Sequence, residues 1–145
     1  MEKTFNFGKY SGIDSSIVAK YDPYYITWGL ENLVNVRQDK CNFLKCKDVF
    51  MKTYDKDKTY DDICKDINNN FIGKCFETKR NILVEFLDID ENNIEVTVLL
   101  AKPFNIGQAV LELETVIKLI SRIKNEITLN EFNEKIYKIW KEMRK

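Results

Sequence analysis

The sequence contains no histidine, and this absence removes several classes of enzyme from consideration. Serine and cysteine nucleophiles activated by histidine, histidine-ligated zinc enzymes and HNH-type nucleases all require an imidazole. The chain also lacks a C-x-x-C pair, because its cysteines are Cys41, Cys46, Cys64 and Cys75. Without close ligand pairs a zinc site has little to organise it. We therefore expect reduced, buried thiols, with neither a metal nor a cofactor.

An excess of charge of one sign is missing too, since 23 basic and 23 acidic residues give a formal net charge of zero. No global field attracts the chain to phosphate or to a lipid surface, so any nucleic-acid contact depends on a local patch. Apolar runs such as that from Val96 to Ala101 are far shorter than the roughly 20 residues of a membrane helix. The start of the chain lacks a secretory segment. We expect a cytoplasmic protein with no membrane partner.

The residues that are present suffice for a globular fold, because 44% of the 145 residues are hydrophobic and 12% are aromatic. The patterns predict a single α+β domain over residues 1–145. Its expected parts are a strand–loop–helix unit in 1–33, a helical or irregular segment in 34–70, a three-stranded antiparallel meander in 71–102 and a helical hairpin in 104–145.

The first part begins with an expected strand over residues 4–7, followed by a glycine-containing loop. Hydroxyl and carboxylate side chains then open a short predicted helix over 14–20. A second helix is predicted over 22–32, with Asp22 as the N-cap and Pro23 at the first helical position. Proline fits that position because its missing N–H has no partner there in any case.

The middle of the chain is less regular. A helix from about residue 40 to 54 is one interpretation of its scattered apolar residues. Thr59, followed three residues later by Asp62, indicates a capped helix over about 60–68. The stretches "FIGKCFETK", "NILVEFLDID" and "NIEVTVLLAK" are rich in β-branched and aromatic residues and are separated by turn signals. They predict the three strands of the meander.

Two amphipathic helices are predicted after Pro103, the first extending to about residue 126. Its seven-residue spacing is carried by Ile106, Leu113, Ile120 and Ile127, with Ala109, Val116 and Ile123 between them. Thr128 and Glu131 form a capping-box pattern at the start of the second helix. Both helices are expected to cover one face of the meander. Further apolar residues widen the stripe and predict a partner or homodimer interface through these helices: Val110, Ile117, Leu119 and Trp140.

Acidic clusters are the remaining catalytic candidates. Asp88 or Asp90 followed by Glu95 has the spacing of a magnesium nuclease hairpin, but Thr97 stands where that site needs lysine. Residues 55–66 have the spacing of a calcium loop but lack its glycine and its final glutamate. Turns and helix caps explain these carboxylates better. A metal-dependent nuclease stays an alternative, and the main expectation is a protein that is not an enzyme.

The opening stretch "FNFGKYSGIDSSIVAKYDPYYITWGLEN" has a recognisable pattern. It contains F-G-K-Y-x-G, a short helix with an apolar pair, and then D-P-x-Y-x-x-W, carried here by Phe7 to Gly12, Ile17, Val18, Asp22, Pro23, Tyr25 and Trp28. This pattern resembles the small C-terminal domain of exodeoxyribonuclease X-like proteins. The resemblance covers about residues 4–33.

The resemblance implies a non-catalytic accessory module that binds or accompanies DNA. Basic residues that family members often carry are replaced here by Ser11 and Ile13, which leaves two local lysines. The residues expected to contact nucleic acid are Lys9, Tyr10, Lys20, Tyr21 and Tyr24. Tyr25 and Trp28 are expected in the core.

Two functional hypotheses follow. The first is a phage or mobile-element accessory protein that contacts nucleic acid through this module. The alternative is a protein-binding anti-defence inhibitor, similar to anti-CRISPR proteins, that binds a host nuclease complex. The small size, the neutral charge and the surplus of apolar helix surface favour the alternative, and the acidic residues of 55–66 suit mimicry of nucleic acid.

Overall fold

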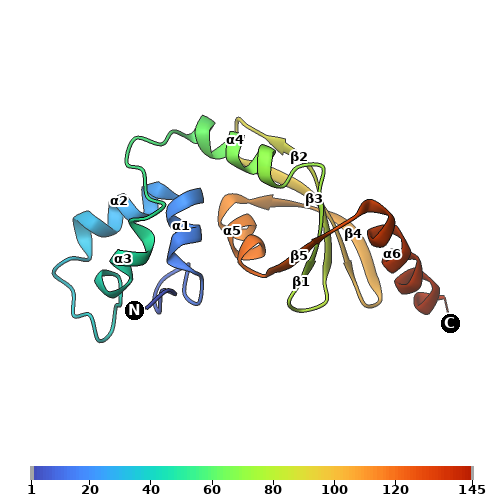
Figure 1. The fold of residues 1–145 in the computed structure, drawn as a ribbon, viewed down its shortest axis with the longest axis horizontal. Coiled ribbons are helices and arrows are strands. Elements are labelled where there is room, and N and C mark those ends of the chain that lie inside the picture. The colour runs from blue at the N-terminus through green and yellow to red at the C-terminus, as the bar shows by residue number, and fades with distance from the viewer. Residues whose placement is uncertain (1, 145) are drawn as a thin grey trace. The chain divides into compact units, whose positions relative to one another are not determined.

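The computed structural model describes residues 2–144 and divides the chain into two compact units. Unit 1 is Met1–Ile63 and unit 2 is Cys64–Lys145, and each is described by itself. The fold is α+β, as predicted, with all of its named strands in unit 2 (Figure 1). The composition of the sequence shows no boundary at this position.

Unit 1 is built from short helices, which are α1 (Ser15–Tyr21), α2 (Pro23–Asn32), a 3-10 turn η1 (Leu44–Cys46), α3 (Lys47–Phe50) and the start of α4 (Tyr60–Asn70). The predicted helices over 14–20 and 22–32 are confirmed. Asp22 caps α2, since its side chain accepts a hydrogen bond from the backbone N–H of Tyr25. The helix expected over 40–54 is wrong in extent, because only η1 and α3 form there.

The segment before α1 is a loop rather than the expected strand over 4–7. It makes a single isolated bridge, between Thr4 and Asp14. The loop closes on Phe5, whose N–H donates to the carbonyl of Ile13 at 3.1 Å and whose carbonyl accepts from the N–H of Gly12 at 2.7 Å. Gly12 has a φ of 82°, a backbone conformation that side chains with a Cβ rarely adopt.

The core of unit 1 is aromatic. The ring of Phe43 lies 5.9 Å from that of Phe5 and 5.0 Å from that of Phe50, and all three side chains are fully buried. Helix α2 approaches this cluster so closely that a Cβ added at Gly29 would lie within 3.0 Å of three Phe43 ring atoms. The absence of a side chain at position 29 therefore permits the packing of α2.

Unit 2 contains a five-stranded antiparallel sheet in the order β4-β3-β2-β1-β5. The strands are β1 (Cys75–Thr78), β2 (Leu83–Asp90), β3 (Glu95–Lys102), β4 (Asn105–Glu112) and β5 (Ile123–Ile127). The first three lie where the sequence predicts strands. The sheet then continues, because β4 pairs along the whole of β3, and β5 returns to pair with β1.

The predicted C-terminal helical hairpin is wrong in its first half. Residues 105–112 form β4, only Leu113–Ser121 form a helix (α5), and 123–127 form β5. Backbone pairing outweighs the seven-residue spacing here, because the tight turn after Lys102 aligns Asn105 with Lys102 and starts a complete ladder with β3. Gly107 and the β-branched Val110 also disfavour a helix. The second helix is confirmed as α6 (Leu129–Met143), with Thr128 accepting from the N–H of Glu131.

Helices α5 and α6 lie on opposite sides of the sheet (Figure 1). Phe132 of α6 packs on Cys75, Leu83, Ala101 and Ile127, which all belong to one face. The opposite face contains the mutually packed rings of Phe71, Phe76 and Phe86. Within residues 2–144, no helix combines the length and the apolar character needed to cross a membrane.

Candidate functional site

The loop and helix that carry the family resemblance are joined through Asp22. The Tyr10 hydroxyl donates to Asp22 Oδ2 at 2.6 Å, and the backbone N–H of Tyr25 donates to Asp22 Oδ1 at 3.3 Å. The Lys9 ammonium lies 3.9 Å from the same Oδ2. One carboxylate thus fixes the loop and caps α2 at once, which explains why F-G-K-Y and D-P occur together.

Tyr25 also packs against this contact between the loop and α2. Its ring lies edge-on to the Tyr10 ring, with centroids 4.9 Å apart and planes at 86°. A Cβ at Gly8 would lie 2.7 Å from the Tyr25 hydroxyl oxygen, and Gly8 has a φ of 66°, so glycine is required there on two grounds. Burial raises the pKa of Tyr25 to about 12, so this hydroxyl stays protonated at neutral pH.

The structure places two of the tyrosines predicted to contact nucleic acid in the interior. Tyr10 is 0% exposed and Tyr21 is 4% exposed, so the expectation that their rings stack on bases is wrong. The reason is the sharp corner between α1 and α2, which closes around the capping carboxylate of Asp22. Tyr24, by contrast, is exposed.

Three exposed aromatic side chains form the most distinctive surface of unit 1: Tyr24, Trp28 and Tyr60, here called the aromatic strip. Their exposed fractions are 42%, 48% and 52%. The rings of Tyr24 and Tyr60 stack at 4.5 Å with planes at 27°, and Trp28 stacks on Tyr25 at 5.6 Å. The strip joins the family-like segment to the start of α4.

The prediction that Trp28 lies in the core is wrong, because Trp28 is not on the side of α2 that faces the core. Pro23, Ile26 and Gly29 are the buried residues of α2, and Phe43 fills the space above Gly29. Tyr24 and Trp28, four residues apart, share another face of the helix. That spacing was visible in the sequence, whereas nothing local indicated that Tyr60 would join them.

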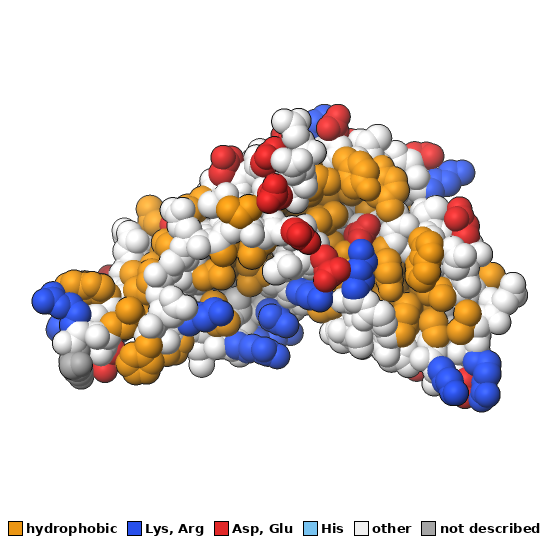
Figure 2. Space-filling model, turned by 180° about the vertical axis from the view of Figure 1, so that it is seen from behind, with side chains coloured by type: hydrophobic (Ala, Val, Ile, Leu, Met, Phe, Trp, Pro, Cys, Tyr) orange, Lys and Arg blue, Asp and Glu red, His pale blue; other side chains and the backbone are white. Residues whose placement is uncertain are grey.

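Three lysines of unit 1 lie over aromatic rings outside the aromatic strip. The ammonium groups of Lys20 and Lys58 lie 5.4 Å and 5.9 Å from the Tyr21 ring centroid, and Lys58 donates to the Lys20 carbonyl at 2.5 Å. Lys9 lies over the rings of Tyr10 and Tyr25. Figure 2 shows both basic and acidic side chains on this face.

Single residues of the acidic segments make local hydrogen bonds to the backbone. No group of three metal-ligating side chains comes together among residues 2–144. Asp62 and Thr59 form the predicted reciprocal cap of α4, and Asp90 accepts from the backbone N–H of Asn92 in the β2–β3 turn. Glu77 accepts from Lys135 at 2.5 Å, and this hydrogen bond holds the pKa of its carboxyl below the ordinary value.

All four cysteine side chains are buried, and none of them forms a disulfide bond. Burial is the main cause that raises the pKa of Cys46 and of Cys75 to about 11. At neutral pH these two thiols are therefore protonated, and they lack the thiolate character that makes a cysteine reactive.

The residues predicted for a partner interface separate into two groups. Val110 on β4 is 61% exposed and Trp140 on α6 is 42% exposed, so both are accessible. Ile117 is fully buried, so the prediction that it lies in an interface is wrong, and Leu119 is half-buried. An apolar groove of about 660 Å³ lies beside α6 and includes Ile106 and Trp140 in its lining.

Comparison with protein-family models, curated proteins and solved structures gives no match for this chain. The resemblance of residues 4–33 to the exodeoxyribonuclease X-like domain therefore stays a prediction from the sequence.

Proposed function

We propose that this chain is a non-catalytic accessory protein of a phage or other mobile element that binds single-stranded nucleic acid through unit 1. The observation that carries the proposal is the aromatic strip of Tyr24, Trp28 and Tyr60, whose side chains are about half exposed. Exposed aromatic rings stack on bases of any sequence and contribute about 1–3 kcal/mol per base. The resemblance of the surrounding segment to a DNA-associated module supports the same function.

The charges of unit 1 set the mode of binding. Lys9, Lys20 and Lys58 lie over the rings of Tyr10, Tyr21 and Tyr25 in the same unit, while unit 1 as a whole carries ten basic and ten acidic residues. Stacking therefore supplies most of the affinity, and phosphate contacts are few. If three lysines contact phosphate, the logarithm of affinity falls with the logarithm of salt with a slope of about −2, since each contact contributes about 0.7 on a single strand.

The test is fluorescence anisotropy with labelled oligothymidylate and oligouridylate at low ionic strength, with a duplex for comparison. We expect single strands to bind and Trp28→Ala to weaken binding about tenfold or more. Tyr137→Ala is the matched control, because Tyr137 is an equally accessible aromatic residue, 55% exposed, in unit 2. Circular dichroism verifies that both variants stay folded.

A second measurement detects binding in a variant that keeps Trp28, so its result does not depend on whether Trp28→Ala stays folded. The chain has two tryptophans, so Trp140→Phe leaves Trp28 as the sole reporter. Stacking on a base quenches the Trp28 emission in a concentration-dependent way. Absence of both quenching and anisotropy change for every single strand tested, or an equal loss in the Tyr137→Ala control, refutes the proposal.

The second candidate function is a protein-binding anti-defence inhibitor, and Phe104 is the observation that favours it. This side chain is 72% exposed at the β3–β4 turn, and its φ of 67° is unusual for a bulky residue. Exposed aromatic anchors dominate many protein interfaces. Inhibition of a purified RNA-guided nuclease complex that is lost in Phe104→Ala and kept in Trp28→Ala supports this function over the first.

A further inference from the structure

Strand β4 is an open edge of the sheet in unit 2. It is last in the strand order, so one side of its backbone has no neighbouring strand within the sheet. Its sequence "NIGQAVLE" contains no proline and no charge before the final Glu112. An edge of this length without charge or proline is a template for pairing with another strand.

The opposite edge of the same sheet is protected. Strand β5 has 5 residues where β4 has 8, and its sequence "IKNEI" carries Lys124 and Glu126. Its register with β1 also shifts between Glu77 and Thr78. Short length, charge and an irregular register are the features with which proteins block edge pairing, so their presence on β5 alone makes β4 the distinct edge.

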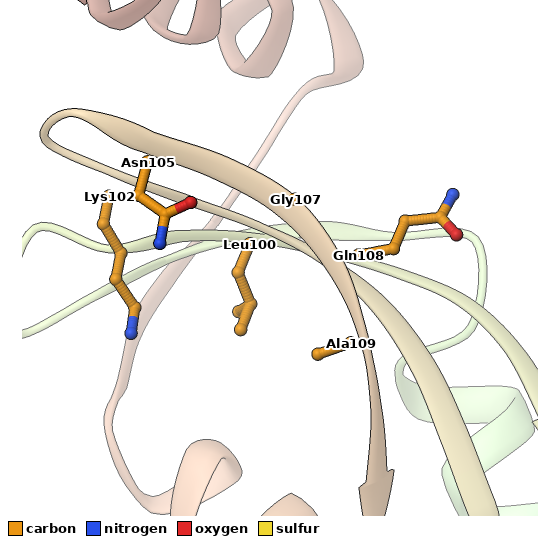
Figure 3. Close-up of a pocket in the computed structure, with 6 residues that line it drawn as sticks. All are labelled: Leu100, Lys102, Asn105, Gly107, Gln108 and Ala109. Atoms are coloured by element: carbon orange, nitrogen blue, oxygen red, sulfur yellow. The ribbon is translucent and has the colours of Figure 1, made fainter.

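Apolar surface continues from the β4 edge onto α6. Side chains alternate between the two faces of a strand, so Ile106, Gln108 and Val110 share the face on which α6 packs. Figure 3 shows Gln108 turned away from the side to which Leu100 and Ala109 point. Val110 is 61% exposed, and Ile106 also lines the groove beside Trp140.

We propose that the β4 edge pairs with β4 of a second copy of this chain, antiparallel about a two-fold axis, to form one continuous ten-stranded sheet. The two-residue turn of Pro103 and Phe104 makes Lys102 and Asn105 the closing pair of the hairpin. Hydrogen-bonded and non-hydrogen-bonded residue pairs then alternate along the β3–β4 ladder. The backbone N–H and C=O groups of the even-numbered β4 residues therefore point to the open edge. Gln108 is the central one of the three such residues that precede Glu112.

The side chains of β4 are complementary to themselves when the axis passes through Gln108. Ile106 then faces Val110 of the second copy, Gly107 faces Ala109 of the second copy, and the two Gln108 amides meet. Moving the axis by one residue places Ile106 opposite Gln108 or Glu112. Apolar cross-strand pairs are favourable, and the matched register therefore identifies the occupant as another copy.

Cysteine cross-linking tests the arrangement directly. In the proposed dimer, residue 108 faces itself, and the Cα atoms of such a bonded pair lie about 5.5 Å apart, within the range that a disulfide spans. We expect Gln108→Cys to form a disulfide-linked dimer under mild oxidation. Asn125→Cys on the protected β5 edge is the matched control and should form no disulfide-linked dimer, and the four native thiols are buried.

Sedimentation equilibrium provides the second test. The unmodified chain should show a concentration-dependent monomer–dimer equilibrium, and Val110→Lys should raise the dissociation constant about tenfold or more, because it places lysine against Ile106. Asn125→Lys should leave it unchanged. A monomer at all concentrations without cross-linking of Gln108→Cys overturns the proposal, as does equal cross-linking at position 125. The nucleic-acid proposal concerns unit 1 and is unaffected by either result.

Discussion

Replacing Tyr10 by phenylalanine separates a structural role for this residue from a role in binding. The substitution removes one hydroxyl from a side chain that is 0% exposed and leaves its ring in place. The hydroxyl donates to Asp22 Oδ2 at 2.6 Å, and Asp22 is itself only 9% exposed. The carboxylate that caps α2 therefore loses a donor that water cannot readily replace.

The size of the effect follows from the charge of the acceptor. Hydrogen bonds to ionised groups contribute about 1.5–3 kcal/mol, roughly twice the value for neutral pairs. Asp22 keeps the N–H of Tyr25 and the nearby Lys9 ammonium, so part of its stabilisation remains. We expect Tyr10→Phe to lower the free energy of unfolding of unit 1 by about 2 kcal/mol.

Urea unfolding followed by Trp28 emission, in a Trp140→Phe background, measures this loss in unit 1. The midpoint should fall while the slope with urea stays constant, since the surface exposed on unfolding does not change. Tyr24→Phe is the matched control: it removes the same hydroxyl from a side chain that is 42% exposed, and it should change stability by less than about 0.5 kcal/mol.

Two results would contradict this reasoning. Equal unfolding free energies for Tyr10→Phe and Tyr24→Phe would mean that the Tyr10–Asp22 bond contributes nothing. Oligonucleotide binding by Tyr10→Phe can be measured at a urea concentration at which unit 1 is still fully folded. A large loss of binding under that condition would mean that Tyr10 contacts the ligand. A double-mutant cycle with Asp22→Asn isolates the pair, and its coupling energy should account for most of the loss.

Three further predictions concern packing, strain and charge. Gly29→Ala should destabilise unit 1 by about 1–3 kcal/mol despite its better helix propensity, because the new Cβ overlaps the Phe43 ring; urea unfolding measures it, and a gain in stability would refute it. Phe104→Gly should make unit 2 more stable than Phe104→Ala by about 0.5–1 kcal/mol in thermal unfolding, because glycine accepts a positive φ, and equal stabilities would contradict the strain. Lowering the pH below 4.5, the ordinary pKa of a glutamate, should destabilise unit 2 as Glu77 is protonated, because Lys135 lowers the folded-state pKa of this carboxyl. Lys135→Met should flatten that part of the pH profile, and an unchanged profile would exclude the ion pair as its cause.

The elements of this fold that the sequence predicts well have local chemical signals. Asp22 with Pro23 and Thr128 with Glu131 start helices because a side chain next to the first turn satisfies a backbone N–H that has no other partner. The strands before Pro103 were visible as β-branched runs between turn residues. In each case the decisive interaction is made within a few residues.

The wrong predictions lie where a contact between residues far apart in the sequence determines the structure. Ile106 and Ile127 fit a helical spacing, but they lie on β4 and β5, which the ladders with β3 and β1 hold in place. Hydrophobic spacing cannot distinguish these cases, because a sheet edge and an amphipathic helix both require apolar residues at intervals. Trp28 is misplaced for a similar reason, since the core position beside α2 is taken by Phe43 from a later segment.

The same distinction changes what the family resemblance can predict. Gly8, Tyr10, Asp22 and Pro23 carry much of the shared pattern, and the structure uses them for a positive φ, an interior hydrogen bond and a helix cap. Residues with such roles preserve the shape of a loop and helix whatever the surface binds. Function in unit 1 must therefore be tested at exposed positions such as Trp28 and Tyr60. For Trp28 the stability of unit 1 has to be measured alongside binding, because this ring stacks on Tyr25 beside Asp22.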